Sequence, residues 1–149
     1  MYGFMLLIHI LAATIWTGGH LVLATVILPR VLRTKDPEYL LTFEAAYEKI
    51  GIPALLAQVI SGIWLAHQMV PNVSSWGDFT NPLSQLIVIK LSLLFITVLF
   101  AADARLRLIP HLTTDNLTAL AWHIIPVTII SVLFVAVGVS FRTGLIAFL

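Results

Sequence analysis

The chain has 149 residues, of which 60% are hydrophobic and 10% are charged, and its formal net charge is +1. A soluble domain averages about 25% charged residues, so this composition and the mean hydropathy of +1.03 indicate a membrane protein. The small net charge gives no basic surface for nucleic acid. The lack of cysteine excludes disulfides, thiolate metal sites and iron–sulfur clusters.

Four stretches are long and apolar enough to cross a bilayer, which takes about 20 mostly apolar residues per helix. They cover about residues 4–28, 45–70, 83–104 and 119–141. We therefore predict an all-α integral membrane protein with one domain over residues 1–149, an antiparallel four-helix transmembrane bundle. The first stretch lacks a basic leader and a cleavage site, so we expect a retained membrane helix rather than a signal peptide.

Turn-forming residues set the predicted ends of these helices. Pro29 follows the first apolar run and is predicted to stop that helix, with a polar loop over residues 29–43. The segment "PNVSSWGDFTNP" is rich in Pro, Gly, Asn and Ser and is predicted to be a loop. The segment "RLRLIPHLTTDN" separates the last two helices, and Thr114, Asp115 and Asn116 are candidates for an N-cap.

The distribution of cations predicts the orientation of the chain. The loop after the first helix and the start of the second helix carry Arg30, Arg33, Lys35 and Lys49, and the third loop carries Arg105 and Arg107. The second loop carries none, and Arg142 is the single cation near the other face. By the positive-inside rule, loops 29–43 and 105–118 face the cytoplasm and both termini lie outside. We expect a multi-pass protein of a bacterial inner (cytoplasmic) membrane.

The first helix contains the stretch "LLIHILAATIWTGGHLV", which places His9 and His20 among apolar residues. Eleven residues at 100° each amount to about three turns plus 20°, so both rings leave one face, about 16 Å apart. Trp16 lies within about 20° of His9 on that face. Because ionisable side chains are costly in hydrocarbon, this face is a candidate functional site.

Depth estimates suggest two histidine pairs. His67 lies near the outer end of the second helix, level with His9, and His123 lies near the inner start of the fourth helix, level with His20. Facing histidines at one depth are what bis-histidine haem ligation requires. The alternative is that each histidine is a hydrogen-bonding partner between helices. His111 lies in a loop and is expected to be solvated.

Small residues and a tryptophan support this prediction of two metal sites. Small side chains on the first helix are predicted to leave room for a macrocycle, and they are Ala12, Ala13, Gly18 and Gly19. Trp16 is predicted to pack between an outer and an inner site and to contact the cofactor.

Lys90, in "QLIVIKLSLL", lies about 10 Å below the outer surface among apolar residues. Either its side chain snorkels outward, or it faces an anion such as a haem propionate, a quinone oxygen or a substrate carboxylate. We assign it a catalytic and cofactor-binding role.

Other polar residues are assigned structural roles. Gln58 points about 180° away from His67 and is a candidate for joining chains in a homo-oligomer. A structural cluster of ion pairs is predicted at the cytoplasmic rim, from Glu44, Glu48, Lys49, Asp103, Arg105 and Arg107.

The stretch "HILAATIWTGGHLV" followed by "LPRVL" resembles the first helix of the copper resistance protein D family. The resemblance extends to "FEAAYEKIGIPALLAQVISGIWLA" and to the lysine of "VIKLSLL". The related four-helix, haem-containing protoporphyrinogen oxidases share the early histidine, the tryptophan and Leu-Pro-Arg. In those oxidases a helix-one histidine and a helix-three lysine form the functional pair, which implies His9 and Lys90 here. His20, His67 and His123 depart from that pattern and favour a protein with more metal ligands.

These observations lead us to predict a membrane-embedded b-type haem oxidoreductase. His9 and His67 would hold one haem b, and His20 and His123 a second haem or copper. Electrons would pass between membrane quinol and a small oxidant (oxygen, superoxide or nitric oxide). Membrane lipid is also an expected partner, because it would surround the bundle. The alternatives are a copper transport or copper-delivery protein with the histidines as its ion path, a porphyrinogen oxidase, and a non-catalytic membrane subunit.

Overall fold

The computed structural model describes residues 1–145, and these form a bundle of long helices without a β-strand. The helices are α1 (Tyr2–Val22), α2 (Leu28–Thr34), α3 (Pro37–Met69), α4 (Pro82–Asp103) and α5 (Leu117–Thr143). α1 and α2 are parts of one continuous helix, so four helices are long and apolar enough to cross a membrane. The predicted fold class, a four-helix membrane bundle, is confirmed.

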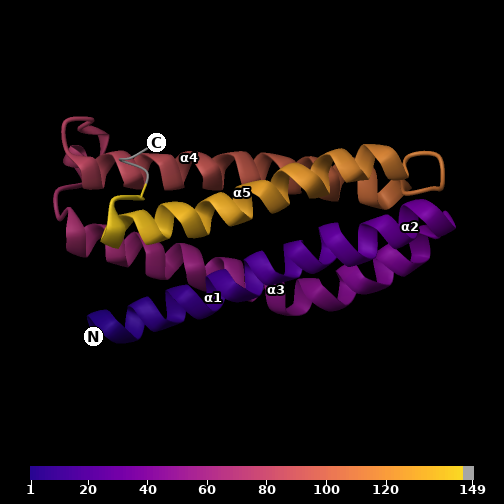
Figure 1. The fold of residues 1–149 in the computed structure, drawn as a ribbon, viewed down its shortest axis with the longest axis horizontal. Coiled ribbons are helices and arrows are strands. Elements are labelled where there is room, and N and C mark those ends of the chain that lie inside the picture. The colour runs from indigo at the N-terminus through magenta and orange to yellow at the C-terminus, as the bar shows by residue number, and fades with distance from the viewer. Residues whose placement is uncertain (146–149) are drawn as a thin grey trace.

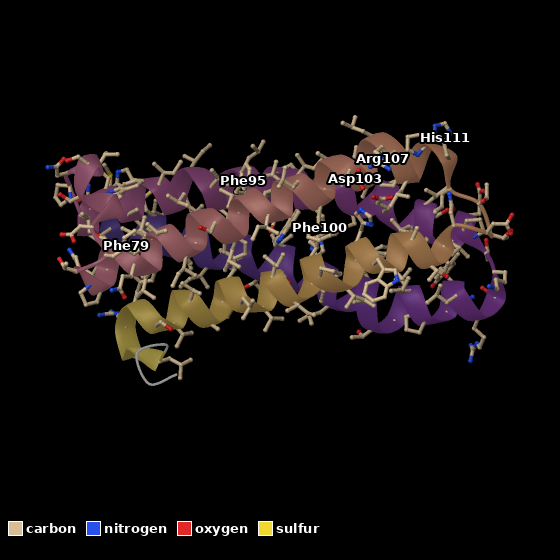
Figure 2. All side chains as sticks on the ribbon, turned by 90° about the horizontal axis from the view of Figure 1, so that it is seen from above. Phe79, Phe95, Phe100, Asp103, Arg107 and His111 are labelled. Atoms are coloured by element: carbon tan, nitrogen blue, oxygen red, sulfur yellow. The ribbon has the colours of Figure 1, made fainter. Side chains whose placement is uncertain are left out.

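The two ends of the bundle differ in what they carry. Figure 1 shows the N-terminus, the α3–α4 loop and the end of α5 together at one end, which we call the terminal end. The α2–α3 turn and the α4–α5 loop lie at the opposite end, which we call the hairpin end. Figure 2 shows the same separation, with Phe79 at the terminal end and His111 at the hairpin end. α1 packs along α3, α4 along α5, and α5 also packs against α1.

The first helix does not stop at Pro29, so that prediction is wrong. A π-helical turn, Leu23–Ile27, precedes the proline, and the helix continues as α2 to Thr34. Proline lacks an N–H and its ring crowds the carbonyl one turn earlier, and a wider turn at that point accommodates both. The chain leaves the helix at Lys35, which has a left-handed φ of 57°.

The polar loop predicted over residues 29–43 is far shorter in the structure. α3 begins at Pro37, where the Asp36 carboxylate caps the helix by accepting a hydrogen bond from the Tyr39 N–H at 3.3 Å. A capping aspartate followed by proline at the first position is a favoured helix start. α3 therefore begins about eight residues earlier than predicted and is 33 residues long.

The α4–α5 connection repeats the pattern of the first helix. α4 passes into a π-helical turn, Ala104–Leu108, and then into a 3₁₀ turn that contains Pro110. α5 begins after Asn116, one of the three predicted N-cap residues. The Asn116 side chain folds the loop instead of capping the helix, since its oxygen accepts from the Thr113 N–H and its amide donates to the His111 carbonyl.

The loop at the terminal end is ordered by its own hydrogen bonds. The Trp76 indole N–H donates to the Val70 carbonyl at 2.8 Å, and the Ser84 hydroxyl of α4 donates to the Ser75 carbonyl. Hydrogen bonds from the Thr80 hydroxyl and N–H hold the pKa of the Asp78 carboxyl below its usual value. The segment 71–82, predicted as a loop, contains a short 3₁₀ turn, Val73–Gly77.

A cluster of buried apolar side chains lies at the hairpin end. The buried cluster there joins residues of the first helix, α3 and α5, and comprises Leu23, Ile27, Leu28, Val31, Leu40, Leu117, Leu120, Ala121 and Ile124. Many apolar side chains nearer the middle of the helices face outward, as Phe95 does in Figure 2. This distribution suits a bundle whose middle is surrounded by lipid.

Candidate functional site

His9 is held by α3. Its Nδ1 lies 3.0 Å from the Gln58 carbonyl oxygen and 3.0 Å from the Ser61 hydroxyl. Because a carbonyl oxygen only accepts, Nδ1 carries the proton and the Nε2 lone pair is left for another partner. A glycine at position 62 permits this approach, since a Cβ there would lie 3.0 Å from His9 Cε1.

The structure does not bring His67 to His9. His67 is exposed in the last turns of α3, six residues beyond Ser61, which corresponds to about 9 Å along the helix. The two rings therefore lie at different depths. The outer ends of α1 and α3 lie within two residues of those predicted, so the offset comes from the packing of α1 along α3, which sets His9 against residues 58–62.

His20 is buried beside aromatic rings. Its Nδ1 donates to the Trp16 carbonyl at 2.9 Å, and its ring centroid lies 4.3 Å from that of Trp16 and 5.9 Å from that of Tyr47. The same tautomer argument applies, so Nε2 of His20 carries the lone pair. Trp16 packs against His20 and not at the midpoint between two metal sites.

His123 binds a carboxylate of α4. Its Nε2 lies 2.8 Å from Asp103 Oδ2, its Nδ1 lies 3.0 Å from the Ala119 carbonyl, and Phe100 packs edge-on against its ring. Asp103 also accepts from Arg107. Both ring nitrogens of His123 are therefore occupied by partners within the chain.

The second predicted pair is also offset. The Thr128 hydroxyl of α5 donates to the His20 carbonyl at 3.2 Å, which places these two residues at one level. His123 lies five residues nearer the hairpin end, or about 7.5 Å. Neither predicted pair is brought face to face. The four histidines instead form a staggered series, which we call the histidine ladder, in the order His67, His9, His20 and His123.

Lys90 points at α5. Its Nζ lies 3.5 Å from the position that a Cβ on Gly138 would take and 5.7 Å from the centroid of the Phe141 ring. The contacts from Thr17 to Ser131 and from Thr128 to His20 give the α1–α5 register, which places His9 beside residue 139. Lys90 and His9 are thus level, as expected from the sequence.

Gln58 is the polar residue whose place the sequence did not predict. Its side chain is only 8% exposed, inside the bundle, and its Oε1 has no hydrogen-bond partner. The prediction that Gln58 joins two chains is wrong, because it lies with His9 in the interior. Gln58 lies three residues before Ser61 and four before Gly62, so the three residues share one helical face. This spacing is the feature of the sequence that could have predicted its position inside the bundle.

The ion pairs predicted at the rim are present in part. Arg105 binds Glu48 of α3, and Arg107 binds Asp103 at 2.8 Å. Figure 2 shows Asp103 and Arg107 toward the end that carries His111. The additional bond between Asp103 and His123 joins this ion-pair cluster to the last member of the histidine ladder.

The space predicted for a macrocycle at Gly19 is filled. The Tyr47 ring of α3 lies so close to Gly19 that a Cβ there would overlap it, and the Tyr47 hydroxyl donates to the Trp16 carbonyl at 3.0 Å. Within residues 1–145, no three His, Asp or Glu side chains gather in a group that could hold a metal ion. The four histidines of the ladder lie singly, at separate depths.

Comparison with known proteins identifies the family. The sequence model of copper resistance protein D matches residues 41–141, which span most of α3, all of α4 and most of α5. No curated protein and no solved structure matches the chain. The relation to protoporphyrinogen oxidases stays a prediction. The prediction of a haem oxidoreductase with electron transfer is wrong, since the match points to copper and supports the alternative reading. The chain belongs to the copper resistance protein D family.

Proposed function

We propose that this protein handles copper in the membrane, as a transport or delivery protein that passes the ion along the bundle. The observation that carries the proposal is the family match over residues 41–141. Copper is the cargo, and the proposal requires no resident cofactor. Four apolar helices with polar groups at successive depths are consistent with a path for an ion.

We assign the histidine ladder as the set of ligands. His9 and His20 each have Nδ1 tied to a backbone carbonyl, so each can offer an Nε2 lone pair to a metal. A hydrogen bond from the other ring nitrogen fixes the orientation of a histidine ring and raises the basicity of the nitrogen that binds the metal. Imidazole is a good ligand for copper. Met5, one helical turn before His9 on the same face, could add a soft thioether.

The ladder has two distinct ends. His67 is exposed at the terminal end and can receive an ion from outside the bundle. His123 at the hairpin end is bound to Asp103, so an ion that arrives there must compete with an existing hydrogen bond. This competition would favour release over retention. We propose entry at His67 and exit at His123.

The proposed direction depends on orientation in the membrane. Cations gather at the hairpin end, and the α3–α4 loop at the terminal end has none. By the positive-inside rule this distribution favours a cytoplasmic hairpin end and external termini, in a bacterial inner membrane.

Copper uptake into vesicles tests the proposal. Purified protein in liposomes is given copper, and the copper retained after filtration is measured over time. We expect faster uptake than in empty liposomes. His9→Ala should lower the initial rate at least about tenfold. Loss of an outer-shell partner of a metal ligand already costs about 10–100-fold in metal affinity or activity, and this variant removes a proposed ligand itself.

His111→Ala is the matched control for this experiment. His111 is exposed in the α4–α5 loop and lies outside the ladder, so its replacement should leave uptake unchanged. Uptake no faster than in empty liposomes, together with no copper bound by the purified protein, would contradict the proposed function.

A further inference from the structure

α1 and α3 lie side by side in Figure 1, and an open apolar groove runs between them, which we call the α1–α3 groove. Its most buried lining residues are the small Ala12 and Ala54, and larger exposed side chains beside them include Leu11, Ile15 and Ile50. Its volume is about 410 Å³, within the range of about 300–1,000 Å³ that is typical of ligand sites. Small residues between larger ones leave room for an extended apolar chain.

The groove runs along the bundle. On α3 its lining extends from Lys49 to Ala57, which corresponds to about 12 Å, and on α1 from Ile8 to Ile15, which corresponds to about 10 Å. Because these helices are long and apolar enough to cross a membrane, the groove has the direction of the acyl chains in a surrounding bilayer. This direction suits a lipid acyl chain.

A cation stands at the hairpin side of the groove. Lys49 is exposed and lines the groove, and among residues 1–145 no ion pair includes it, while the neighbouring Glu48 is bound to Arg105. Residues 50–66 carry no charged side chain and form a helical run about 25 Å long, so Lys49 marks the edge of the apolar part of α3. Helical side chains lean toward the start of their helix, here the hairpin end, and a lysine extends its ammonium to the headgroup region in this way.

A proline in the same groove changes the backbone at Lys49. Pro53 lies inside α3 and lines the groove. Because proline has no N–H, the Lys49 carbonyl lacks the donor that would normally bind it one turn later in a helix. Position 49 therefore offers a cation and a backbone acceptor together, which match a phosphate and a hydroxyl of one headgroup.

We propose that the α1–α3 groove binds one anionic phospholipid of the phosphatidylglycerol type from the leaflet at the hairpin end. Its acyl chain lies in the groove, its phosphate binds the Lys49 ammonium, and a headgroup hydroxyl donates to the Lys49 carbonyl. A zwitterionic lipid would bring a second cation next to Lys49 and is therefore disfavoured. This inference does not depend on the proposed copper function.

Native mass spectrometry of the purified protein in detergent tests the proposal, with phosphatidylglycerol or phosphatidylcholine of the same acyl chains as the probe. We expect one phosphatidylglycerol to bind more tightly than phosphatidylcholine. Lys49→Met should weaken its binding about fivefold, the effect of one basic contact with an anionic lipid. Lys35→Met is the matched control, because Lys35 is exposed at the same end and does not line the groove. Equal affinity of the wild type for both lipids, or unchanged binding by Lys49→Met, would overturn the proposal.

Two further variants test the charge and the groove separately. Lys49→Arg retains the cation and should retain phosphatidylglycerol, so loss of the lipid from this variant would overturn an electrostatic contact. Ala57→Leu places bulk in the groove and should lose the lipid, whereas Leu56→Phe adds bulk on the same helix outside the groove and should keep it. Lipid retained by Ala57→Leu, with helical circular dichroism equal to that of the wild type, would overturn the groove as its site.

A second copy of the chain is the competing occupant of the groove. The same spectra measure it, because a dimer has twice the mass of the protein. We expect Ala57→Leu to change lipid binding and leave the oligomeric state as it is in the wild type. A wild-type dimer that Ala57→Leu dissociates, with no effect of phosphatidylglycerol, would overturn the lipid assignment in favour of an interface between two chains.

Discussion

At the scale of single residues, contacts between neighbouring helices decide which polar groups are available. His9 and His20 both bind backbone carbonyls through Nδ1, whereas His123 uses both nitrogens within the chain. Because the protonated nitrogen is determined by the partner, chemically identical side chains acquire different abilities to bind a metal. Their surroundings differ because α3, α1 itself and α4 supply the respective partners.

Gly19 provides a residue-scale prediction. A Cβ at this position would overlap the Tyr47 ring, so Gly19→Ala should push that ring away from Trp16 and His20 and lower stability by about 1–3 kcal/mol, the usual cost of overpacking. Thermal unfolding of the purified protein in detergent measures the effect.

Gly18→Ala is the control for that substitution. No atom lies within 4 Å of a Cβ at Gly18, and alanine favours helix over glycine by up to about 1 kcal/mol. This variant should be as stable as the wild type or more stable. Equal melting of Gly19→Ala and the wild type would show that the α1–α3 contact is looser than described.

At the scale of elements, two helices pass through π-helical turns shortly before a proline. Leu23–Ile27 precedes Pro29, and Ala104–Leu108 precedes Pro110. Both turns lie toward the hairpin end, where the buried apolar cluster holds the helices together. α2 therefore keeps its packing although proline interrupts the hydrogen bonding of the helix.

This cluster should dominate stability against unfolding. Leu40 of α3 is 2% exposed within it, so Leu40→Ala should cost about 2–5 kcal/mol through lost contacts and a residual cavity. Leu56→Ala on the same helix is the control, because Leu56 is 58% exposed and faces the surrounding lipid or detergent. Denaturant or thermal unfolding distinguishes them, and equal losses would contradict a core at the hairpin end.

At the scale of the whole molecule, both ends of the bundle are chemically distinct. The terminal end carries a cation-free loop and exposed His67, and the hairpin end carries four of the five arginines and the Asp103–His123 pair. In the proposed ion path, these unlike ends correspond to entry at His67 and exit at His123. The direction in a cell depends on which end faces the cytoplasm.

Cysteine labelling measures this orientation, because the chain has no native cysteine. With the hairpin end inside, Ser74→Cys in the α3–α4 loop should react with a membrane-impermeant maleimide on intact cells. Thr114→Cys in the α4–α5 loop should react only after lysis. The reverse pattern would invert the proposed entry and exit.

The sequence by itself predicted four helices long and apolar enough to cross a membrane, because the length of each apolar run specifies such a helix. It also determined that His9 and His20 share a face, since helical geometry depends only on their spacing, and it placed Lys90 level with His9. It did not determine the register between helices. The outer ends of α1 and α3 lie within two residues of those predicted, yet His9 packs against Ser61, six residues or about 9 Å along α3 from His67. Only the tertiary structure shows that the four histidines lie at separate depths and that Gln58 lies inside the bundle. The reason is that the register between helices depends on close packing between side chains of different helices, and the hydrophobicity along one helix does not specify it.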